Sequence, residues 1–317
     1  MDISIVVPVY NEEESLGELR AWIESILSVD SLTYEVIFVD DGSNDGSWKV
    51  IEALSSKHAA VRGIRFRRNY GKAAALHTGF QSSSGEIVIT MDADLQDSPE
   101  EIPELVRMIR EEGYDLVSGW KKKRYDPLTK RIPSRLYNWF AWQVSGIKLH
   151  DFNCGLKAYR NQVVKSIEVY GDMHRYIPLL AKRAGFTKIG EKVVQHQKRK
   201  YGSTKYGMKR FIVGYLDLIS IGFIGRFGRR PMHLFGTFGT LMFLVGFFAA
   251  AWLGGQKIYY TIHSIPMPRV TQSPYFYLAL TAMIIGTQLF LAGFLGELIT
   301  RNSTVRNEYL IDETINL

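Results

Sequence analysis

The first 125 residues alternate between short apolar runs and segments with helical periodicity. Five runs have the length and β-branched or aromatic content of strands, at residues 3–9, 34–39, 61–66, 86–91 and 115–119. Between the first two, leucine and isoleucine recur at helical spacing from Leu16 to Leu27. Because strands that alternate with helices form parallel sheets with right-handed crossovers, the pattern predicts an α/β domain with a mostly parallel sheet.

Two much longer apolar segments lie near the end of the chain. Residues 234–255 and 270–296 contain no Asp, Glu, Lys or Arg. Each exceeds the roughly 20 residues that a helix needs to cross a bilayer, so both are predicted to be transmembrane helices. Residues 211–227 are also apolar but are interrupted by Asp217, Gly222 and Arg226, a pattern that favours an interfacial helix over a third span.

The pattern divides the chain into an α/β domain at 1–208, an interfacial helix at 209–230, a two-helix anchor at 231–300 and a tail at 301–317. Basic residues flank the outer ends of the two spans: Lys209, Arg210, Arg226, Arg229, Arg230, Arg301 and Arg306. The loop between the spans carries only Lys257 and Arg269. By the positive-inside rule, both termini are predicted to be cytoplasmic.

Composition agrees with a soluble domain carried on a membrane anchor. Of the 317 residues, 46% are hydrophobic and 22% are charged, and the net charge is +7. A nucleic-acid partner would leave the two spans unexplained, so we interpret the basic excess as contact with a membrane surface. The only cysteine, Cys154, excludes an intrachain disulfide and a cysteine-rich zinc site. The first apolar run lacks a basic leader, and we expect a strand there instead of a signal peptide.

Polar motifs follow the predicted strands. They are Tyr10-Asn11-Glu12, Asp40-Asp41-Gly42-Ser43, Asn69-Tyr70-Gly71-Lys72 and Asp92-Ala93-Asp94. Ligands of open α/β sheets bind at the ends where these strands terminate. Asp92 and Asp94, two residues apart and followed by Gln96, can converge on one hard cation, although such acidic pairs also occur as solvated turns. No glycine-rich dinucleotide or P-loop motif is present.

Two basic segments lie between the fifth predicted strand and the spans. Residues 121–135 gather seven lysines and arginines, and residues 195–207 combine basic residues with glycine. The first segment fits either a solvated loop or a site for an anionic phosphate substrate, to which arginine gives bidentate contacts. The second fits either a linker or a lid that orders over phosphates.

Taken in order, the strand-end motifs resemble those of family-2 inverting glycosyltransferases with the GT-A fold. The matching stretches are Val7-Pro8-Val9-Tyr10-Asn11-Glu12, Val39-Asp40-Asp41-Gly42-Ser43, Asn69-Tyr70-Gly71-Lys72 and Asp92-Ala93-Asp94-Leu95-Gln96. More narrowly, the chain is similar to polyprenyl-phosphate glycosyltransferases of the dolichol-phosphate mannosyltransferase type, and within them to the bactoprenol glucosyltransferase branch with two C-terminal spans. The resemblance implies a GT-A domain, with a Rossmann-like and mostly parallel sheet.

The resemblance also implies roles for individual residues. A metal loop that holds Mg²⁺ or Mn²⁺ is implied for Asp92, Asp94 and Gln96. Contacts with the nucleotide sugar are implied for Pro8, Tyr10, Glu12, Asp40, Asp41, Lys72 and Asp92. Contacts with the acceptor and its phosphate are implied for Arg131, Ser134, Arg135, Arg199, Ser203 and Lys205. Asp151 matches the acid usually proposed as catalytic, and Asp94 and Arg131 are implied to join it there.

The implied activity is metal-dependent, inverting transfer of a hexose to polyprenyl (undecaprenyl) phosphate at the cytoplasmic face of a bacterial inner membrane. UDP-glucose is the expected donor, but the residues fit GDP-mannose, UDP-N-acetylhexosamine and UDP-aminoarabinose as well. A non-catalytic scaffold that binds sugar nucleotides is the alternative of another class; it would tolerate loss of Asp94 or Gln96, and both are present. Glycines in both spans permit close helix contacts and a homo-oligomer.

Overall fold

The computed structural model describes residues 1–28, 32–122, 138, 141–143, 145–171, 173–197, 200–201, 231–266, 269–302 and 311–316. The chain forms two units. One consists of Met1–Ile219 together with Arg306–Leu317, and the other is Ser220–Val305. The first contains a sheet and its covering helices, and the second is a helical hairpin. The interfacial helix predicted at 211–227 lies outside the described residues.

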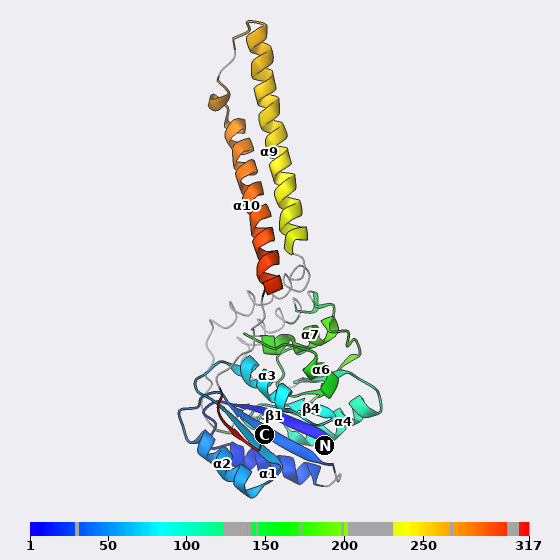
Figure 1. Cartoon of the computed structure of the whole chain (residues 1–317). Coiled ribbons are helices and arrows are strands. Elements are labelled where there is room, and N and C mark those ends of the chain that lie inside the picture. The colour runs from blue at the N-terminus through cyan, green and yellow to red at the C-terminus, as the bar shows by residue number, and fades with distance from the viewer. Residues whose placement is uncertain are drawn as a thin grey trace. The chain divides into compact units, whose positions relative to one another are not determined.

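A mixed sheet organises the first unit (Figure 1). Its strands are β1 (Ile3–Val9), β2 (Tyr34–Asp40), β3 (Val61–Phe66), β4 (Ile87–Thr90), β5 (Leu116–Trp120), β6 (Lys157–Arg160), β7 (Ile189–Val193) and β8 (Ile311–Ile315). They lie in the order β7-β5-β6-β4-β1-β2-β3-β8. The pairs β1–β2, β1–β4, β2–β3 and β5–β7 are parallel, whereas β6 and β8 pair antiparallel with their neighbours. The five predicted strands are confirmed, and β6, β7 and β8 are additions.

Helices cover both faces of the sheet. They are α1 (Leu16–Leu27), α2 (Ser47–Lys57), α3 (Lys72–Ser82), α4 (Ile102–Arg110), α6 (Asn161–Lys165) and α7 (Ile177–Arg183), with the short turns η1 (Pro99–Glu101) and η2 (Met173–Tyr176). One core layer joins α1, α2 and α4 to residues such as Ile5 and Phe38, and the opposite layer joins α3 to Ile37 and Val39. Figure 1 shows α1 and α2 on one side of the sheet and α3 on the other.

The last strand, β8, covers an edge of the sheet. It runs antiparallel to β3, with Ile64 opposite Thr314. Beyond it, the side-chain amide of Asn316 donates hydrogen bonds to the Ser55 hydroxyl (2.7 Å) and the Val61 carbonyl (3.2 Å). Because an uncovered edge strand invites pairing with other chains, this strand protects β3. The tail predicted at 301–317 therefore contains a strand of the N-terminal sheet.

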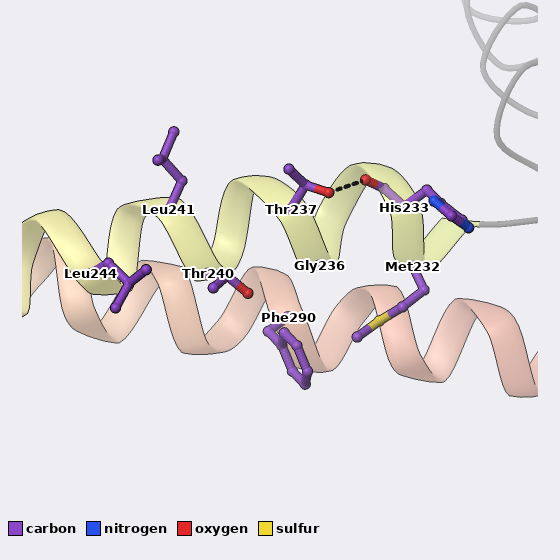
Figure 2. A pocket seen from close by; sticks show the side chains of 8 residues that line it. All are labelled: Met232, His233, Gly236, Thr237, Thr240, Leu241, Leu244 and Phe290. Atoms are coloured by element: carbon purple, nitrogen blue, oxygen red, sulfur yellow. Dashed lines mark hydrogen bonds between the residues drawn. The ribbon is translucent and has the colours of Figure 1, made fainter.

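The second unit consists of two long helices, α9 (Pro231–Ile262) and α10 (Pro274–Asn302), joined through the turn η3 (Val270–Gln272). The segments Met232–Ile262 and Pro274–Gly296 are long and apolar enough to cross a membrane, with mean hydropathies of 1.9 and 2.0. Large side chains such as Phe248 and Trp252 are exposed along the hairpin. An open groove of about 830 Å³ lies along the beginning of α9 and is lined mainly by α9 residues and by Phe290 (Figure 2).

Glycines allow α9 and α10 to touch backbone to backbone. A Cβ atom placed on Gly239 would lie 2.6 Å from the Gly286 carbonyl oxygen, and one on Gly286 would lie 2.6 Å from the Gly239 oxygen. A Cβ on Gly246 would lie 2.5 Å from the Ala279 oxygen. No side chain fits at these distances, so the glycines predicted to permit close helix contacts form the interface inside the hairpin.

We expect Gly239→Ala to separate the two helices and to lower stability by about 1–3 kcal/mol, because the added methyl group meets backbone atoms that cannot move aside. Gly254→Ala is the matched control, since a Cβ there meets nothing within 4 Å. It should be neutral or slightly stabilising through its better helix propensity. Thermal unfolding of the full-length protein in one detergent compares the two variants, and equal melting temperatures would contradict the tight contact.

Candidate active site

The carboxyl ends of β1, β2 and β4 lie side by side because these strands pair in parallel. The loops after β1 and β2 are hydrogen-bonded together at Asn11. Its backbone N–H donates to the Ser43 hydroxyl (2.9 Å), and its side-chain oxygen accepts from the Asn44 N–H (2.8 Å). Asn11 has φ of 54°, a conformation that asparagine tolerates better than most residues. The predicted nucleotide-sugar residues of these two exits are thereby gathered at one place: Pro8, Tyr10, Glu12, Asp40 and Asp41.

Asp41 connects the end of β2 to the loop before α3. Its carboxylate accepts the backbone N–H groups of Tyr70 (2.7 Å) and Gly71 (2.9 Å). Burial raises the pKa of this carboxyl to about 6, against the two hydrogen bonds, which favour the charged form. The adjacent Asp40 instead accepts from the Ser43 N–H at 3.0 Å. The two acids therefore support different loops, and the Asp41 carboxyl changes charge near neutral pH.

The predicted metal loop leaves β4 and begins with Asp92. The ammonium group of Lys72, at the start of α3, forms an ion pair with the Asp92 carboxylate. Burial by itself would raise the pKa of Asp92, but the positive charges of Lys72, Lys121 and Lys157 outweigh it and hold the pKa below its usual range. The structure thus places Lys72, from the motif Asn69-Tyr70-Gly71-Lys72, against Asp92, the first acid of the motif Asp92-Ala93-Asp94.

The rest of the loop is turned by Leu95, whose φ of 60° lies in the left-handed region. A bulky residue rarely adopts this conformation, and here its side chain is buried in the core. The turn lets the Gln96 N–H approach the Asp94 carboxylate (3.3 Å). The loop thereby offers carboxylate and amide oxygens, the ligands that Mg²⁺ and Mn²⁺ prefer. Among the described residues no three His, Cys, Asp or Glu side chains form a metal cluster.

A buried ion pair lies directly after the metal loop. Asp97 is fully buried, and Lys121 contacts its carboxylate at 2.6 Å. Burial would lower the pKa of Lys121, yet the Asp97 carboxylate keeps it raised. Asp97 also bridges backbone to backbone with His196, and the Gln197 N–H donates to the Gln96 carbonyl (2.9 Å). His196 and Gln197, which belong to the second basic segment (residues 195–207), are therefore attached to the metal loop.

Asp151 lies on a loop whose backbone groups are held by two side chains of opposite charge. At its start, one oxygen of the Glu191 carboxylate accepts the N–H groups of His150 (2.8 Å) and Asp151 (3.1 Å). At its end, the Lys157 ammonium donates to the carbonyls of Phe152 (3.3 Å) and Cys154. Asp151 itself is 1% exposed. Because both termini of the loop are fixed, the Asp151 carboxylate has a defined position.

The Asp151 loop packs directly on the metal loop. A Cβ atom on Gly155 would lie 2.5 Å from a carboxylate oxygen of Asp92, so a side chain at this position would displace the Asp92 carboxylate. The Gly155 carbonyl also accepts a hydrogen bond from the Thr90 hydroxyl at the end of β4 (2.8 Å). The structure therefore brings Asp92, Lys72 and the loop of Asp151 together. The other predicted site residues, Arg131, Ser134, Arg135, Arg199, Ser203 and Lys205, lie outside the described part of the chain.

Comparison with known proteins identifies the family to which these loops belong. Residues 4–168, more than half of the chain, match the family described as "Glycosyl transferase family 2". The chain belongs to glycosyl transferase family 2. The match runs from β1 through the metal loop to the Asp151 loop, and it includes all four strand-end motifs.

Two relatives of this family-2 chain match it over almost its whole length. A dodecaprenyl-phosphate galacturonate synthase from Rhizobium johnstonii is 33% identical over 304 residues, which cover 95% of this chain and 88% of the relative. An undecaprenyl-phosphate 4-deoxy-4-formamido-L-arabinose transferase from Pseudomonas aeruginosa is 34% identical over 313 residues, which cover 94% and 85%. The similarity therefore extends beyond the family-2 domain.

Solved structures show that the fold is of the GT-A type. The glucosyl-3-phosphoglycerate synthase of Mycobacterium tuberculosis, in complex with Mn²⁺, UDP-glucose and phosphoglyceric acid, has a TM-score of 0.52 and 24% identity. The alignment covers 71% of this family-2 chain and 79% of that protein. This agreement confirms the predicted fold of the N-terminal unit.

Several residues that build the site of this family-2 chain were not assigned roles from the sequence. Glu191 and Lys157 hold the Asp151 loop, and Asp97 supports the metal loop through Lys121. Each is a charged residue in a strand or loop, and sequence patterns place such residues at the surface. The one available signal was the motif Asp-x-Asn-Cys-Gly-x-Lys, in which Lys157 stands six residues after Asp151.

The raised pKa of Asp41 predicts how stability depends on pH. The folded protein binds a proton at Asp41 near pH 6 and the unfolded chain only near pH 3.8, so the contribution of Asp41 to stability falls as the pH rises from about 4 to 6. We expect the melting temperature of the wild type, relative to Asp41→Asn, to decrease across this interval.

Asp45→Asn provides the control for this measurement. Although burial opposes it, hydrogen bonds from Ser47 lower the pKa of Asp45 below its usual value of 3.8, so it titrates on the acid side of this interval. The melting temperature of the wild type relative to this variant should stay constant from about pH 5 upward. A constant difference for Asp41→Asn as well would contradict the raised pKa of Asp41.

Proposed function

We propose that this family-2 chain transfers a sugar from a nucleotide sugar to the phosphate of a polyprenyl lipid. The observation that carries the proposal is the full-length match to two relatives with polyprenyl-phosphate acceptors in their names, which extends through the segment of the two apolar helices. The site adds chemical support. An oxygen-rich loop beside lysines is suited to a diphosphate, and it lies against the loop of a buried aspartate.

The donor is proposed to lie across the ends of β1, β2 and β4. Pro8, Tyr10, Glu12 and the pair Asp40 and Asp41 would contact the nucleoside, as the family resemblance implies. A set of oxygen ligands would hold Mg²⁺ or Mn²⁺ against the diphosphate: Asp92, Asp94 and Gln96. When bound, the cation neutralises the charge that develops on the leaving diphosphate. The ammonium of Lys72, already beside Asp92, would share that task.

The reaction is a single displacement at the anomeric carbon. An oxygen of the acceptor phosphate forms a bond to that carbon while the bond to the donor diphosphate breaks, and the nucleoside diphosphate leaves with the electron pair. Attack from the opposite side inverts the anomeric centre. A phosphate monoester loses its second proton near pH ~6, so the nucleophile is already ionised at neutral pH. We therefore propose that Asp151 orients groups at the reacting centre and does not remove a proton.

The acceptor lipid requires a site at the membrane surface. We propose that α9 and α10 span the bacterial inner membrane, with the catalytic unit and both termini in the cytoplasm. The pairing of β8 with β3 supports this arrangement, because it requires both ends of the hairpin to be on one side of the membrane. Basic residues outside the described part of the chain are proposed to contact the lipid phosphate: Arg131, Arg135, Arg199 and Lys205, with Ser134 and Ser203.

The roles of the two aspartates predict different losses of activity. Asp94→Ala should remove nearly all turnover, because it deletes an oxygen ligand of the metal. Asp151→Asn should keep measurable turnover, since the amide preserves the shape of the group and no proton has to be removed. Transfer of labelled sugar at saturating Mn²⁺ measures both, with Glu100→Gln, an exposed acid nearby, as the control. Equal and complete loss in both variants would contradict the proposed division of roles.

The donor sugar is the least constrained part of the proposal. The resemblance favours UDP-glucose, whereas the relatives' names specify galacturonate and 4-deoxy-4-formamido-L-arabinose. Membranes that contain the protein and undecaprenyl phosphate should be tested with a labelled panel of these sugars, N-acetylhexosamine and mannose, each as its nucleotide derivative. We expect one donor to label the lipid fraction, and EDTA to abolish that labelling. Absence of labelled lipid with every donor, in membranes that still bind UDP, would overturn the proposed activity.

A further inference from the structure

A small cavity next to the metal loop is lined by two lysines, an arginine and a histidine. Lys72, Lys157, His174 and Arg175 line it together with the hydroxyl-bearing residues Thr90 and Tyr159. Its wall also includes residues 152–155 of the Asp151 loop. The cavity therefore lies between the two loops that the proposed function assigns to donor and acceptor chemistry, with the turn η2 on its remaining side.

Arg175 is the unexpected member of this group. It is 7% exposed, and its Nε atom is buried with no hydrogen-bond partner. In the part of the chain that the structure describes, no carboxylate lies within ion-pair distance of its guanidinium group and no carbonyl accepts from it. A buried guanidinium nitrogen without a partner is costly, and an anion that reaches Arg175 would supply that partner.

The two lysines of the cavity, by contrast, already have hydrogen-bond or ion-pair partners. Lys72 is neutralised by Asp92, while Lys157 donates to two backbone carbonyls and has no carboxylate partner among the described residues. Among the lysine and arginine side chains of the cavity, Arg175 is thus the one that has no hydrogen-bond or ion-pair partner in the described part of the chain. Guanidinium and ammonium groups that converge in this way suit the oxygens of a phosphate, to which arginine donates two parallel hydrogen bonds.

We propose that Lys72, Lys157 and Arg175 form a phosphate-binding subsite, with Arg175 as its principal ligand. The assignment rests on the proposed function, which supplies phosphate from two sources: the donor diphosphate and the lipid phosphate. A purely structural arginine would instead donate to backbone carbonyls, and no carbonyl of the described residues accepts from Arg175. Arg175 is buried in the free protein at a cost to stability, and it recovers that cost when an anion binds.

The test compares Arg175→Met, Arg175→Lys and the control Arg183→Met, which removes an exposed arginine of the neighbouring helix α7. Full-length protein in lipid nanodiscs is unfolded by heat with and without inorganic phosphate. The wild type and the control should be stabilised by phosphate. Arg175→Met should melt at the wild-type temperature or above without phosphate, and phosphate should no longer stabilise it. Arg175→Lys should keep part of the effect.

Two binding titrations identify the source of the phosphate. One titration uses UDP with Mn²⁺ and the other uses undecaprenyl phosphate. In both, the control Arg183→Met should bind as tightly as the wild type. Arg175→Met should weaken one of them about tenfold or more, as expected when a charge-assisted bidentate contact is lost. Loss in the first titration assigns the subsite to the donor, and loss in the second assigns it to the acceptor.

The proposal is overturned if phosphate does not stabilise the wild type, or if Arg175→Met leaves the phosphate effect and both titrations unchanged. It is equally overturned if Arg175→Met and Arg175→Lys both unfold at clearly lower temperatures without ligand, because Arg175 is then structural. These measurements need no turnover. A protein that binds phosphate through Arg175 but transfers no sugar to lipid would therefore refute the proposed function and leave the subsite standing.

Discussion

The site depends on the balance of charge around Asp92. A carboxylate withdrawn from water tends to bind a proton, and three lysines prevent this by favouring the charged form. Lys72 pairs with Asp92 directly, and Lys121 pairs with Asp97 just after the loop. Because these lysines come from parts of the chain that are far apart in sequence, only the folded chain holds the pKa of Asp92 below its usual value. Such a loop can hold a cation, and the same lysines can receive a diphosphate.

The antiparallel strand β6 brings the Asp151 loop next to the metal loop. It lies between β4 and β5 and begins at Lys157, so the chain just before it must cross the end of β4. That crossing segment carries Asp151. Its backbone is held by Glu191 and Lys157 instead of by regular secondary structure, and Gly155 lets it rest on Asp92. Reversing one strand thus places a buried acid beside a metal loop that lies more than fifty residues earlier in the chain.

The sequence predicted those parts of the fold that local patterns determine. The first five strands are mostly apolar and largely buried, with Arg62 and Arg65 of β3 as partly exposed exceptions, and the polar motifs follow directly from the ends of these runs. By contrast, β6 has only four residues with a basic residue at each end, and β8 has three consecutive polar residues between two isoleucines. Their pairing is decided by neighbours far away in sequence. Glu191 and Arg175 are likewise of residue types that usually lie at the surface, and their positions in the site depend on tertiary contacts.

The strand β8 also constrains the membrane anchor. It pairs with β3 in the N-terminal sheet, so the chain that leaves this unit after its last helices must return to it. A single crossing would leave β8 on the far side of the bilayer, where it could not reach β3. A chain that crosses a bilayer between β3 and β8 must cross it an even number of times, and the two apolar helices meet this condition. The N-terminal unit is joined to the hairpin at both ends, so a strand that protects a sheet edge also requires both connections to lie on the same side of any membrane that the hairpin spans.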